Sequence, residues 1–386
     1  MMARLSEIFD LQMGKTPARA NLDYWNGGTN NWISIADLSG YEKYVGETKE
    51  RISDLAVQES GIKAVPPNTV IMSFKLSLGK TAITREPVYT NEAIMAFIPN
   101  GSRNILPDYF FYMLSGKDWS IKTNRAVMGA TLNKAVLGAI DIVVPPIEEQ
   151  RYVSSVLDKL SGLISLRKRQ LAKLDELVKA RFVEMFGDPV HNPMNWDTVP
   201  LSSIGTFKNG MNFHADDSGA EIHCLGVGDF KHLSFIYDTS HLPIVSLQGF
   251  PSDDYMLQDG DIVFVRSNGN KALVGRSLAV YPGNISTTFS GFCIRFRPDS
   301  EIIETKYILM TLKTASMREK MVGRGANIQN LNQKILSELV IPVPPLSLQN
   351  KFALFVEQTN ESALTIQQSL DKLDVLKKSL MQEYFG

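Results

Sequence analysis

The sequence predicts an α+β protein built by internal duplication, with two globular mixed α/β domains and two long helices that pack on each other. Three observations support this fold class: a long segment with a seven-residue apolar repeat, a gapless second copy of it 199 positions later, and strand-rich sequence elsewhere. The predicted boundaries are residues 1–143 and 188–341 for the globular domains, and residues 144–187 and 342–386 for the helices.

The first long helix is bounded by residues that start and stop helices. Pro145 and Pro146 precede it, and proline suits a helix start but not a helix interior. Gly187 can supply a left-handed cap, and Pro189 prevents continuation. We therefore expect a helix over residues 147–185, roughly 58 Å long at about 1.5 Å per residue.

Apolar residues recur at every seventh position of this helix, which is the pattern of a helix that packs along another helix. One row is Leu157, Ile164, Leu171, Val178 and Met185, and the complementary row is Val153, Leu160 and Leu174, interrupted by Arg167 and Arg181. The pattern returns over residues 343–386, so the partner helix lies in the same chain. Its seam is predicted at Phe352, Val356, Ile366, Leu370, Leu373 and Leu380.

Motifs outside the seam repeat at the same offset. The repeated pairs are Pro145 and Pro344, Gln150 and Gln349, and Phe186-Gly187 and Phe385-Gly386. Two unrelated amphipathic helices are the alternative, but a gapless match with proline pairs at one end and Phe-Gly at the other favours duplication. The Pro- and Asn-rich residues 188–200 form the hinge between the copies.

Each globular domain is predicted to be strand-rich with one covering helix. Strands are expected over residues 69–74, 93–98, 261–265 and 291–296, and helices over 108–114 and 305–312. Residues 76–80 and 266–271 form turns after the first strand of each pair and are rich in small, polar and basic residues. Loops of this composition on a rigid sheet are common recognition sites, although ordinary hairpin turns need no function.

The composition is typical of a soluble globular protein, with 44% hydrophobic and 21% charged residues among 386. The chain starts with polar sequence, which predicts no secretory signal, and it has no apolar run long enough to cross a membrane. Cys224 and Cys293 form no spaced pattern for a metal or a disulfide. We therefore expect a cytoplasmic protein with buried thiols.

The net charge of −1 does not suggest a nucleic-acid binder, but the distribution of charge does. Residues 61–134 hold nine Lys/Arg against four Asp/Glu, and residues 264–334 hold eleven against four. The segments before them, residues 1–60 and 208–263, are acidic. This alternation predicts one basic face in each repeat, with chance clustering on a solvated surface as the alternative.

Motifs for catalysis are missing from the sequence. Pro-Pro occurs three times but is never followed by an aromatic residue, as an adenine methyltransferase loop would require, and no glycine-rich phosphate loop is present. Asp259 and Asp261 lack a nearby Glu-x-Lys, so they are more easily explained as turn residues than as a nuclease site. Four histidines fall nine residues apart, a spacing that offers no metal site. We predict neither catalytic residues nor metal ligands.

The repeated motifs resemble those of the specificity subunits of Type I restriction–modification enzymes. The resemblance rests on the Pro-Pro-(Ile/Leu)-x-x-Gln helix openings, the Phe-Gly helix ends, the run at residues 325–332 and the Leu-x-x-Ile starts, and it covers essentially the whole chain. The first copy departs from the pattern, because residues 129–133 are shorter and lack the glutamine.

The resemblance implies a division of labour between subunits. Each globular domain would be a target-recognition domain that reads one half of a bipartite site in double-stranded DNA. The helices would lie antiparallel in a pseudo-two-fold arrangement, set the spacing, and dock two methyltransferase subunits for adenine methylation. Restriction subunits would cleave unmodified DNA. S-adenosylmethionine, ATP and magnesium would belong to those partners, with no cofactor in this chain.

Basic and amide side chains in or near the basic segments are the candidate DNA contacts, because Arg and Lys bind phosphates and Asn, Gln and Arg read base edges. In the first copy they are Lys15, Arg19, Lys75, Lys80 and Arg125, and in the second Arg266, Asn268, Lys271, Arg276, Arg324, Asn327 and Gln329. The helix-pair and partner interface is predicted at Leu160, Ile164, Leu171, Leu174, Val178, Phe352, Val356, Ile366, Leu370 and Leu373.

Two other classes of function stay open at this point. One is a stand-alone DNA methyltransferase or nuclease with unrecognised motifs, and the other is a coiled-coil scaffold for which the alternating charge is incidental. Methyl-donor binding or strand cleavage by the isolated chain would favour the enzyme.

Overall fold

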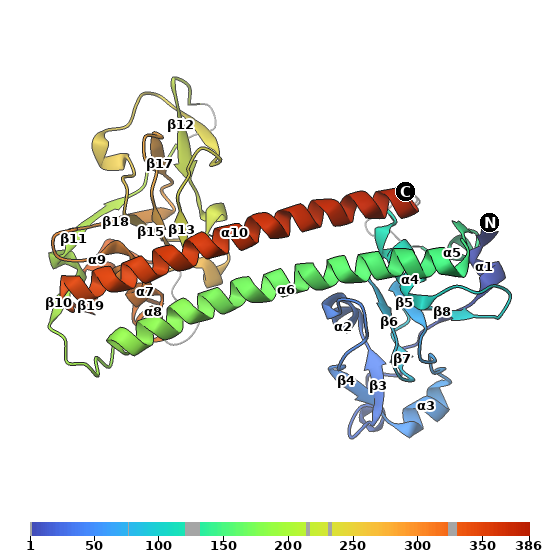
Figure 1. Cartoon of the computed structure of the whole chain (residues 1–386). Coiled ribbons are helices and arrows are strands. Elements are labelled where there is room, and N and C mark those ends of the chain that lie inside the picture. The colour runs from blue at the N-terminus through green and yellow to red at the C-terminus, as the bar shows by residue number, and fades with distance from the viewer. Residues whose placement is uncertain (1, 76, 120–131, 214–216, 231–233, 323–329) are drawn as a thin grey trace. The chain divides into compact units, whose positions relative to one another are not determined.

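The computed structural model describes residues 2–75, 77–119, 132–213, 217–230, 234–322 and 330–386 (Figure 1). The chain divides into two compact units. The first unit comprises Met1–Lys168 and Gln368–Gly386, and the second comprises Arg169–Gln367. Each unit therefore contains one globular part together with portions of both long helices.

The first unit is built from short strands and helices that precede the first long helix. Its strands are β1 (Met2–Arg4), β2 (Phe9–Met13), β3 (Asn30–Ile33), β4 (Glu50–Ile52), β5 (Val70–Ser73), β6 (Thr81–Ile83), β7 (Tyr89–Thr90), β8 (Ile94–Pro99) and β9 (Asp141–Val143). Its helices are α1 (Leu5–Ile8), α2 (Ile35–Gly40), α3 (Asp54–Ser60), α4 (Pro107–Gly116), α5 (Lys134–Gly138) and the start of α6 (Ile147–Phe186).

The second unit repeats this succession. Its strands are β10 (Thr198–Pro200), β11 (Gly205–Asn209), β12 (Ala220–Leu225), β13 (Phe235–Ile236), β14 (Ile244–Leu247), β15 (Asp261–Val265), β16 (Ser277–Val280), β17 (Thr287–Phe289), β18 (Cys293–Pro298) and β19 (Val340–Pro342). Its helices are α7 (Thr305–Lys313), α8 (Ala315–Val322), α9 (Gln333–Ser337) and the start of α10 (Leu346–Phe385). The strands and covering helices predicted from sequence are present in both units.

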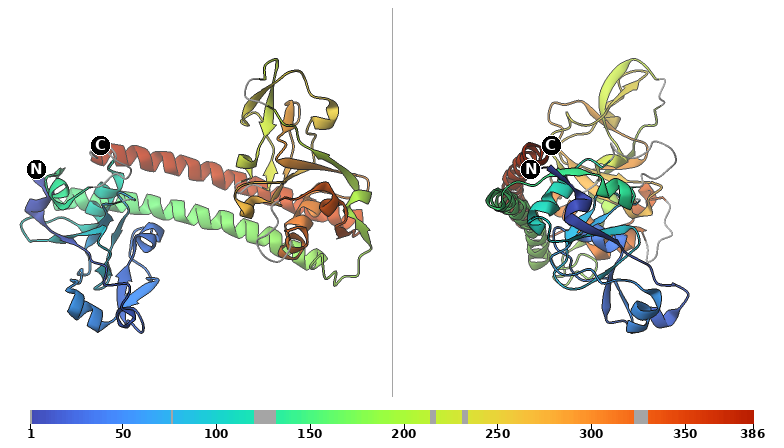
Figure 2. Two further views of the ribbon diagram at one scale, coloured as in Figure 1. Left: turned by 180° about the vertical axis from the view of Figure 1, so that it is seen from behind. Right: turned by 90° about the vertical axis from the view of Figure 1, so that its right-hand side faces the viewer.

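Sheet topology confirms the duplication. The larger sheet has the order β2-β8-β5-β6 in the first unit and β11-β18-β15-β16-β13 in the second, and the smaller sheets are β4-β3-β7 and β14-β12-β17. In both small sheets one pair is parallel, β3 with β7 and β12 with β17. Figures 1 and 2 show that in each unit the smaller sheet lies farther from the long helices than the larger one.

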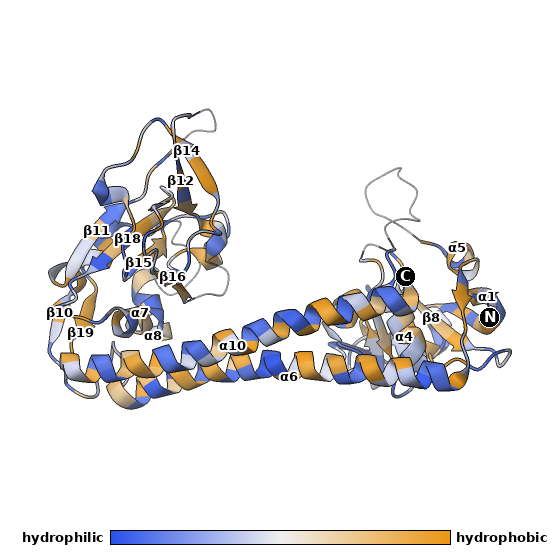
Figure 3. Cartoon of the chain, turned by 45° about the horizontal axis from the view of Figure 1, so that its top comes forward, coloured by the Kyte–Doolittle hydropathy of each residue, from blue (hydrophilic) through white to orange (hydrophobic). Residues whose placement is uncertain are grey.

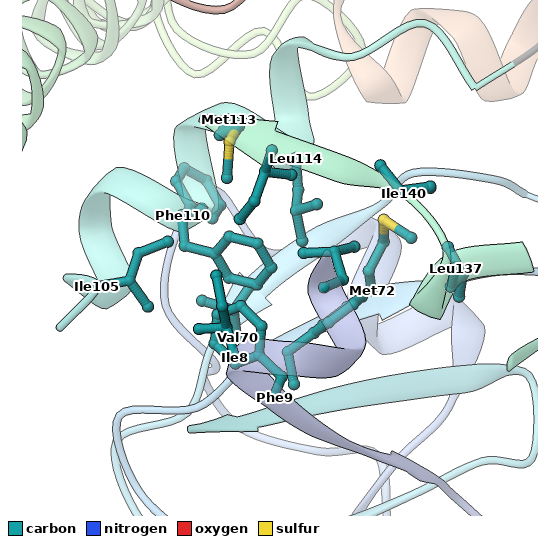
Figure 4. Packing of buried hydrophobic residues seen from close by; sticks show 14 of the residues in the cluster. Ile8, Phe9, Val70, Met72, Ile105, Phe110, Met113, Leu114, Leu137 and Ile140 are labelled. Atoms are coloured by element: carbon teal, nitrogen blue, oxygen red, sulfur yellow. The ribbon is translucent and has the colours of Figure 1, made fainter. Parts of the chain in front are cut away.

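The core of the first unit lies where α4 covers one face of the larger sheet (Figure 4). Phe110 of α4 stacks on Phe9 at 4.3 Å between ring centroids and meets the edge of Phe97 at 5.2 Å. Val70 and Met72 of β5 face the same cluster. These residues alternate along their strands, as expected for a sheet with one face packed on a helix.

The two long helices form as the apolar repeat predicts, each over 40 residues. Hydrophobic residues recur along both (Figure 3). Gly187 follows α6 with a φ of 72°, and a Cβ there would collide with the ring of Pro193, so glycine is required at this cap. Among the predicted seam residues, Leu160, Ile164, Val178, Phe352, Val356 and Leu370 are buried and Leu171, Leu174, Ile366 and Leu373 are half-buried.

The end of each long helix packs on the core of the other repeat. In the second unit, Phe186 at the end of α6 meets the edge of Tyr307 at 4.7 Å and of Phe352 at 5.6 Å. In the first unit, Phe385 at the end of α10 meets Tyr109 at 5.3 Å. Tyr109 and Tyr307 are equivalent residues of the two repeats. In each unit the end of one long helix thus lies beside the start of the other, so the two run antiparallel there.

One buried seam residue was not singled out from the sequence. Arg181 was expected to interrupt the complementary row, and the neighbouring Phe182 is the buried residue there, at 1% exposure, packed between Tyr307 and Phe352. Arg181 instead pairs with Glu184 at 2.8 Å and is half-buried. A straight α-helix drifts from a strict seven-residue repeat, so the buried face moves by one residue near the helix end.

The glutamine of the repeated Pro-Pro-(Ile/Leu)-x-x-Gln motif fastens each long helix to the adjacent covering helix. The Gln150 Nε2 donates to the carbonyl of Asn104 (3.1 Å), and its Oε1 accepts from the amide of Leu106 (2.8 Å), the residue that caps α4. In the second repeat, Oε1 of Gln349 accepts from the amide of Glu304 (2.8 Å), which caps α7. Both glutamines are fully buried.

A lysine in each repeat makes a second link between the long helix and the globular part, reaching the equivalent acidic residues Asp158 and Glu357 from non-equivalent positions. The Lys43 ammonium pairs with Asp108 at 2.7 Å and with Asp158 of α6. The Lys306 ammonium pairs with Glu357 of α10 at 2.8 Å. Burial lowers the pKa of Lys43, but hydrogen bonds to the two aspartates outweigh that effect and raise it overall.

We expect Gln349→Ala to destabilise the second unit by about 1–3 kcal/mol, because it leaves the carbonyl of Pro344 and the amide of Glu304 without their partner. Urea unfolding of the full chain measures the effect. The matched control is Gln368→Ala, an exposed position of the same helix. Equal unfolding midpoints for the two variants would contradict the role given to Gln349.

Candidate nucleic-acid interface

A loop follows the central strand of the larger sheet in each repeat and is held in the same way in both. The first loop, residues 74–80, joins β5 to β6, and the second, residues 266–276, joins β15 to β16. The amide of Phe74 donates to the carbonyl of Ala93 (3.0 Å), and its own carbonyl accepts from Leu132 (3.0 Å). These main-chain bonds fix the base of the first loop on the sheet.

The second loop shows the same pair of bonds. The amide of Arg266 donates to the carbonyl of Phe292 (2.8 Å), and the carbonyl of Arg266 accepts from Leu331 (2.8 Å). An isolated bridge joins Ser267 to Asn330. In both repeats the loop therefore lies between the start of the next strand of the sheet and the residues that follow segments 120–131 and 323–329.

Two predicted residues of the first repeat lie on its loop. The Lys75 ammonium is 5.3 Å from the ring of Phe74, and Lys80 is exposed. The amide of Lys80 donates to Ser73 Oγ (3.0 Å), which closes the loop on the strand that precedes it. Both ammonium groups are carried on backbone that the sheet holds in place.

Lys15 and Arg19 contact the smaller sheet and its helix instead of the loop. The Arg19 guanidinium pairs with both oxygens of Glu50 and lies 3.8 Å from the ring centroid of Trp25. The hydrogen bond to Glu50 raises the pKa of Arg19, so the guanidinium stays charged and is held in an ion pair within the protein. The Lys15 ammonium donates to the carbonyl of Ser60. The structure thus does not bring these two residues to the loop that carries Lys75 and Lys80.

Four predicted residues of the second repeat, Arg266, Asn268, Lys271 and Arg276, lie on its loop. Arg266 and Asn268 are half-buried, and Asn268 Oδ1 accepts from the amide of Asn270 (2.7 Å). Lys271 begins a short 3₁₀ helix. Arg276 closes the loop, and its Nη1 donates to the carbonyl of Phe230 (3.2 Å). Arg125, Arg324, Asn327 and Gln329 lie outside the described residues.

Two cations that the sequence analysis did not single out lie near the second loop, and one of them, Arg318, bonds to it directly. The Arg318 guanidinium of α8 donates to the carbonyls of Ala272 (3.0 Å) and Val274 (3.2 Å). Lys313, at the end of α7, donates to Ser234 Oγ (2.7 Å). Both were visible only as members of the basic segment, because their approach to the loop depends on how α7 and α8 pack.

Electrostatics around Lys313 show a local excess of positive charge. Burial lowers its pKa to about 8; Asp175 opposes this, while Lys179, Arg276 and Arg318 add to it. Burial and the neighbouring Arg276 also lower the pKa of Arg318. Cations that repel one another in this way are stabilised when an anion binds nearby.

The described parts of the chain contain no group of three or more His, Cys, Asp or Glu residues placed to hold a metal ion. Across the same residues, no helix is both long and apolar enough to cross a membrane. The buried thiols of Cys224 and Cys293 have pKa values raised to about 12 by burial, so they stay protonated and unreactive near neutral pH.

Comparison with known proteins identifies the family. The model of the Type I restriction modification DNA specificity domain matches residues 1–176 and 193–375, one match for each repeat. The MjaIX specificity subunit of Methanocaldococcus jannaschii is 23% identical over 98% of this chain and 90% of its own length. The StySPI specificity subunit of Salmonella potsdam is 24% identical over 93% of this chain and 80% of its own length.

Solved structures show the same fold. The S subunit of a Type I restriction–modification system from M. genitalium aligns over 100% of this chain and 96% of its own, with a TM-score of 0.58 and 14% identity. A chain from another type I system, solved to explain complex assembly and conformational transition, aligns over 100% of this chain and 97% of its own, with a TM-score of 0.60 and 16% identity. Because the family model covers both repeats, this chain belongs to the Type I restriction–modification DNA specificity family, whose members are non-catalytic specificity subunits.

Proposed function

We propose that this chain selects the DNA sequence for a Type I restriction–modification complex, with each globular part reading one half of a bipartite site in double-stranded DNA. One observation carries the proposal: both repeats hold a loop with cationic side chains between equivalent strands, by equivalent main-chain bonds to Phe74 and Arg266. Because the cationic loop and the fold that holds it both occur twice, the chain suits a DNA site made of two separate halves.

The chemistry of the loops suits DNA. Lys75 and Lys80 in the first repeat, and Arg266 and Lys271 in the second, can neutralise phosphates, which sets the register of the protein on the duplex. Arg266 and Asn268 also carry donors and acceptors that match base edges in the major groove. We do not assign Lys15 and Arg19 to the DNA-reading loop, because Lys15 donates to the carbonyl of Ser60 and Arg19 pairs with Glu50.

The outward faces of the long helices suit protein partners. Leu163, Leu166 and Leu177 of α6 and Leu364, Val375 and Leu376 of α10 are 44–70% exposed. Apolar side chains exposed in such number on two helices favour docking of other subunits. We assign this surface to two methyltransferase subunits, which would carry S-adenosylmethionine. Restriction subunits would use ATP and magnesium, and the assembly would work in the cytoplasm.

The long helices would act as a ruler between the half-sites. Each unit grips the start of one helix and the end of the other, through contacts such as Phe186 with Tyr307 and Phe385 with Tyr109. With both ends gripped, the number of helical residues between the grips sets the distance between the two DNA-reading loops.

The first test of this function uses the purified full chain with duplex DNA and a labelled methyl donor. We expect salt-sensitive DNA binding without methyl transfer, and adenine methylation once the methyltransferase subunit is added. Methyl transfer by the chain alone would show that it is an enzyme. A complex that methylates without any sequence preference would contradict the reading role.

The ruler is tested by inserting four residues in both helices, between Lys168 and Arg169 and between Gln367 and Gln368. The paired insertion adds roughly 6 Å to each helix and nearly preserves the helical phase. Because base pairs rise about 3.4 Å, we expect the gap in the methylated motif to lengthen by one or two base pairs. The readout is the motif methylated in cells that also produce the methyltransferase subunit.

Insertion in α6 alone or in α10 alone provides the matched controls. Either one moves one helix against the other by about a turn, so the grips at both ends cannot be kept together, and we expect loss of site-specific methylation. An active paired variant with an unchanged gap would mean that the partner subunits, and not the helices, set the spacing.

A further inference from the structure

Phe292, an aromatic residue beside the second loop, is not packed into the protein core. Phe292 is 60% exposed, and it directly precedes β18. Its carbonyl accepts from the amides of Arg266 (2.8 Å) and Ser267 (3.4 Å), so the residue lies against the base of the cationic loop. Most phenylalanines of this chain belong to buried clusters, so an exposed ring at this place needs another explanation.

The backbone that carries Phe292 is fixed. The amide of Gly291 donates to the carbonyl of Met211 (2.6 Å), and a Cβ on Gly291 would collide with the side chain of Asn212. The amide of Phe292 donates to Ser290 Oγ (3.3 Å). A ring presented on constrained backbone loses little conformational entropy when it binds a ligand.

The first repeat shows that the fold does not need an aromatic residue there. Ala93 occupies the equivalent position, is 7% exposed, and accepts from Phe74 as Phe292 accepts from Arg266. The two repeats therefore place their aromatic residue differently: Phe74 is buried under the first loop, whereas Phe292 projects beside the second. The change alters the surface around the loop while the main-chain bonds are kept.

We propose that Phe292 contacts the 5-methyl group of a thymine in the half-site read by the second repeat. In the major groove the thymine methyl is the apolar group that a phenylalanine ring can recognise, while the neighbouring Arg266 and Asn268 supply polar contacts. This proposal rests on the DNA-reading role given above and adds the chemical class of the base edge that is recognised. It also makes the two half-sites differ in kind, since Ala93 offers the first loop no exposed ring.

The test uses the complex of the full chain with its methyltransferase subunits, after the methylated motif has been determined. Each thymine of the second half-site is replaced in turn by deoxyuridine, which lacks only the methyl group. We expect one replacement to weaken binding about fourfold, the factor for one buried methylene-sized group. Phe292→Ala should lose this discrimination, and Phe292→Leu should keep part of it.

Two comparisons make the result decisive. Phe250→Ala removes another exposed ring, which is 67% exposed, and should leave the discrimination intact. Deoxyuridine in the first half-site should affect the wild type and Phe292→Ala equally. The proposal is overturned if no deoxyuridine replacement in the second half-site weakens binding in a way that depends on Phe292. A second half-site without thymine would also overturn it, as would a ring that only wedges between base steps. If the wild-type complex shows no sequence preference, the DNA-reading role itself fails.

Discussion

The contact on which the structure depends is the one between the end of each long helix and the core of the other repeat. Phe186 packs against Tyr307, and Phe385 packs against Tyr109. Because the helix that follows one repeat ends in the other, neither globular core is complete without sequence from both copies. Gln150 and Gln349 then fasten the opposite helix ends to the capping residues of α4 and α7. Both ends of each helix are therefore held by packing or hydrogen-bond contacts, and the same repeated motifs supply these contacts in the two repeats.

This frame separates what the repeats share from what they vary. Both copies share the order of four strands in the larger sheet, the buried glutamines Gln150 and Gln349, and the main-chain bonds at the base of each loop. The loops differ in length and in side chains: the first carries Lys75 and Lys80, and the second carries Arg266 and Asn268 and is supported by Arg318. Because the loop bases are main-chain contacts, loop side chains can change without loss of the fold. The scaffold and the recognition loops can therefore vary separately.

The sequence predicted the duplication, both long helices and the central strands, because these follow from periodicity and repeated motifs. It did not single out Phe182, next to the interruption at Arg181, as a buried seam residue, since the drift of a helix from a seven-residue repeat depends on its partner. It named Arg19 as a candidate DNA contact but did not predict that Glu50 and Trp25 engage its guanidinium beside the smaller sheet. The support of the second loop by Arg318, and the exposure of Phe292, likewise depend on contacts distant in sequence. The sequence shows the type and charge of each residue, but the partner of each side chain depends on the fold.

If one frame carries two readers that act independently, exchanging one of them should change only the half of the site that it reads. Residues 201–341 are replaced by the matching segment of a relative with a different specificity, while both long helices are retained. The measurement is the methylated motif in cells that produce the methyltransferase subunit. We expect one half of the motif to change while the other half and the gap stay the same. A change in both halves, or in the gap, would show that the two readers do not act independently.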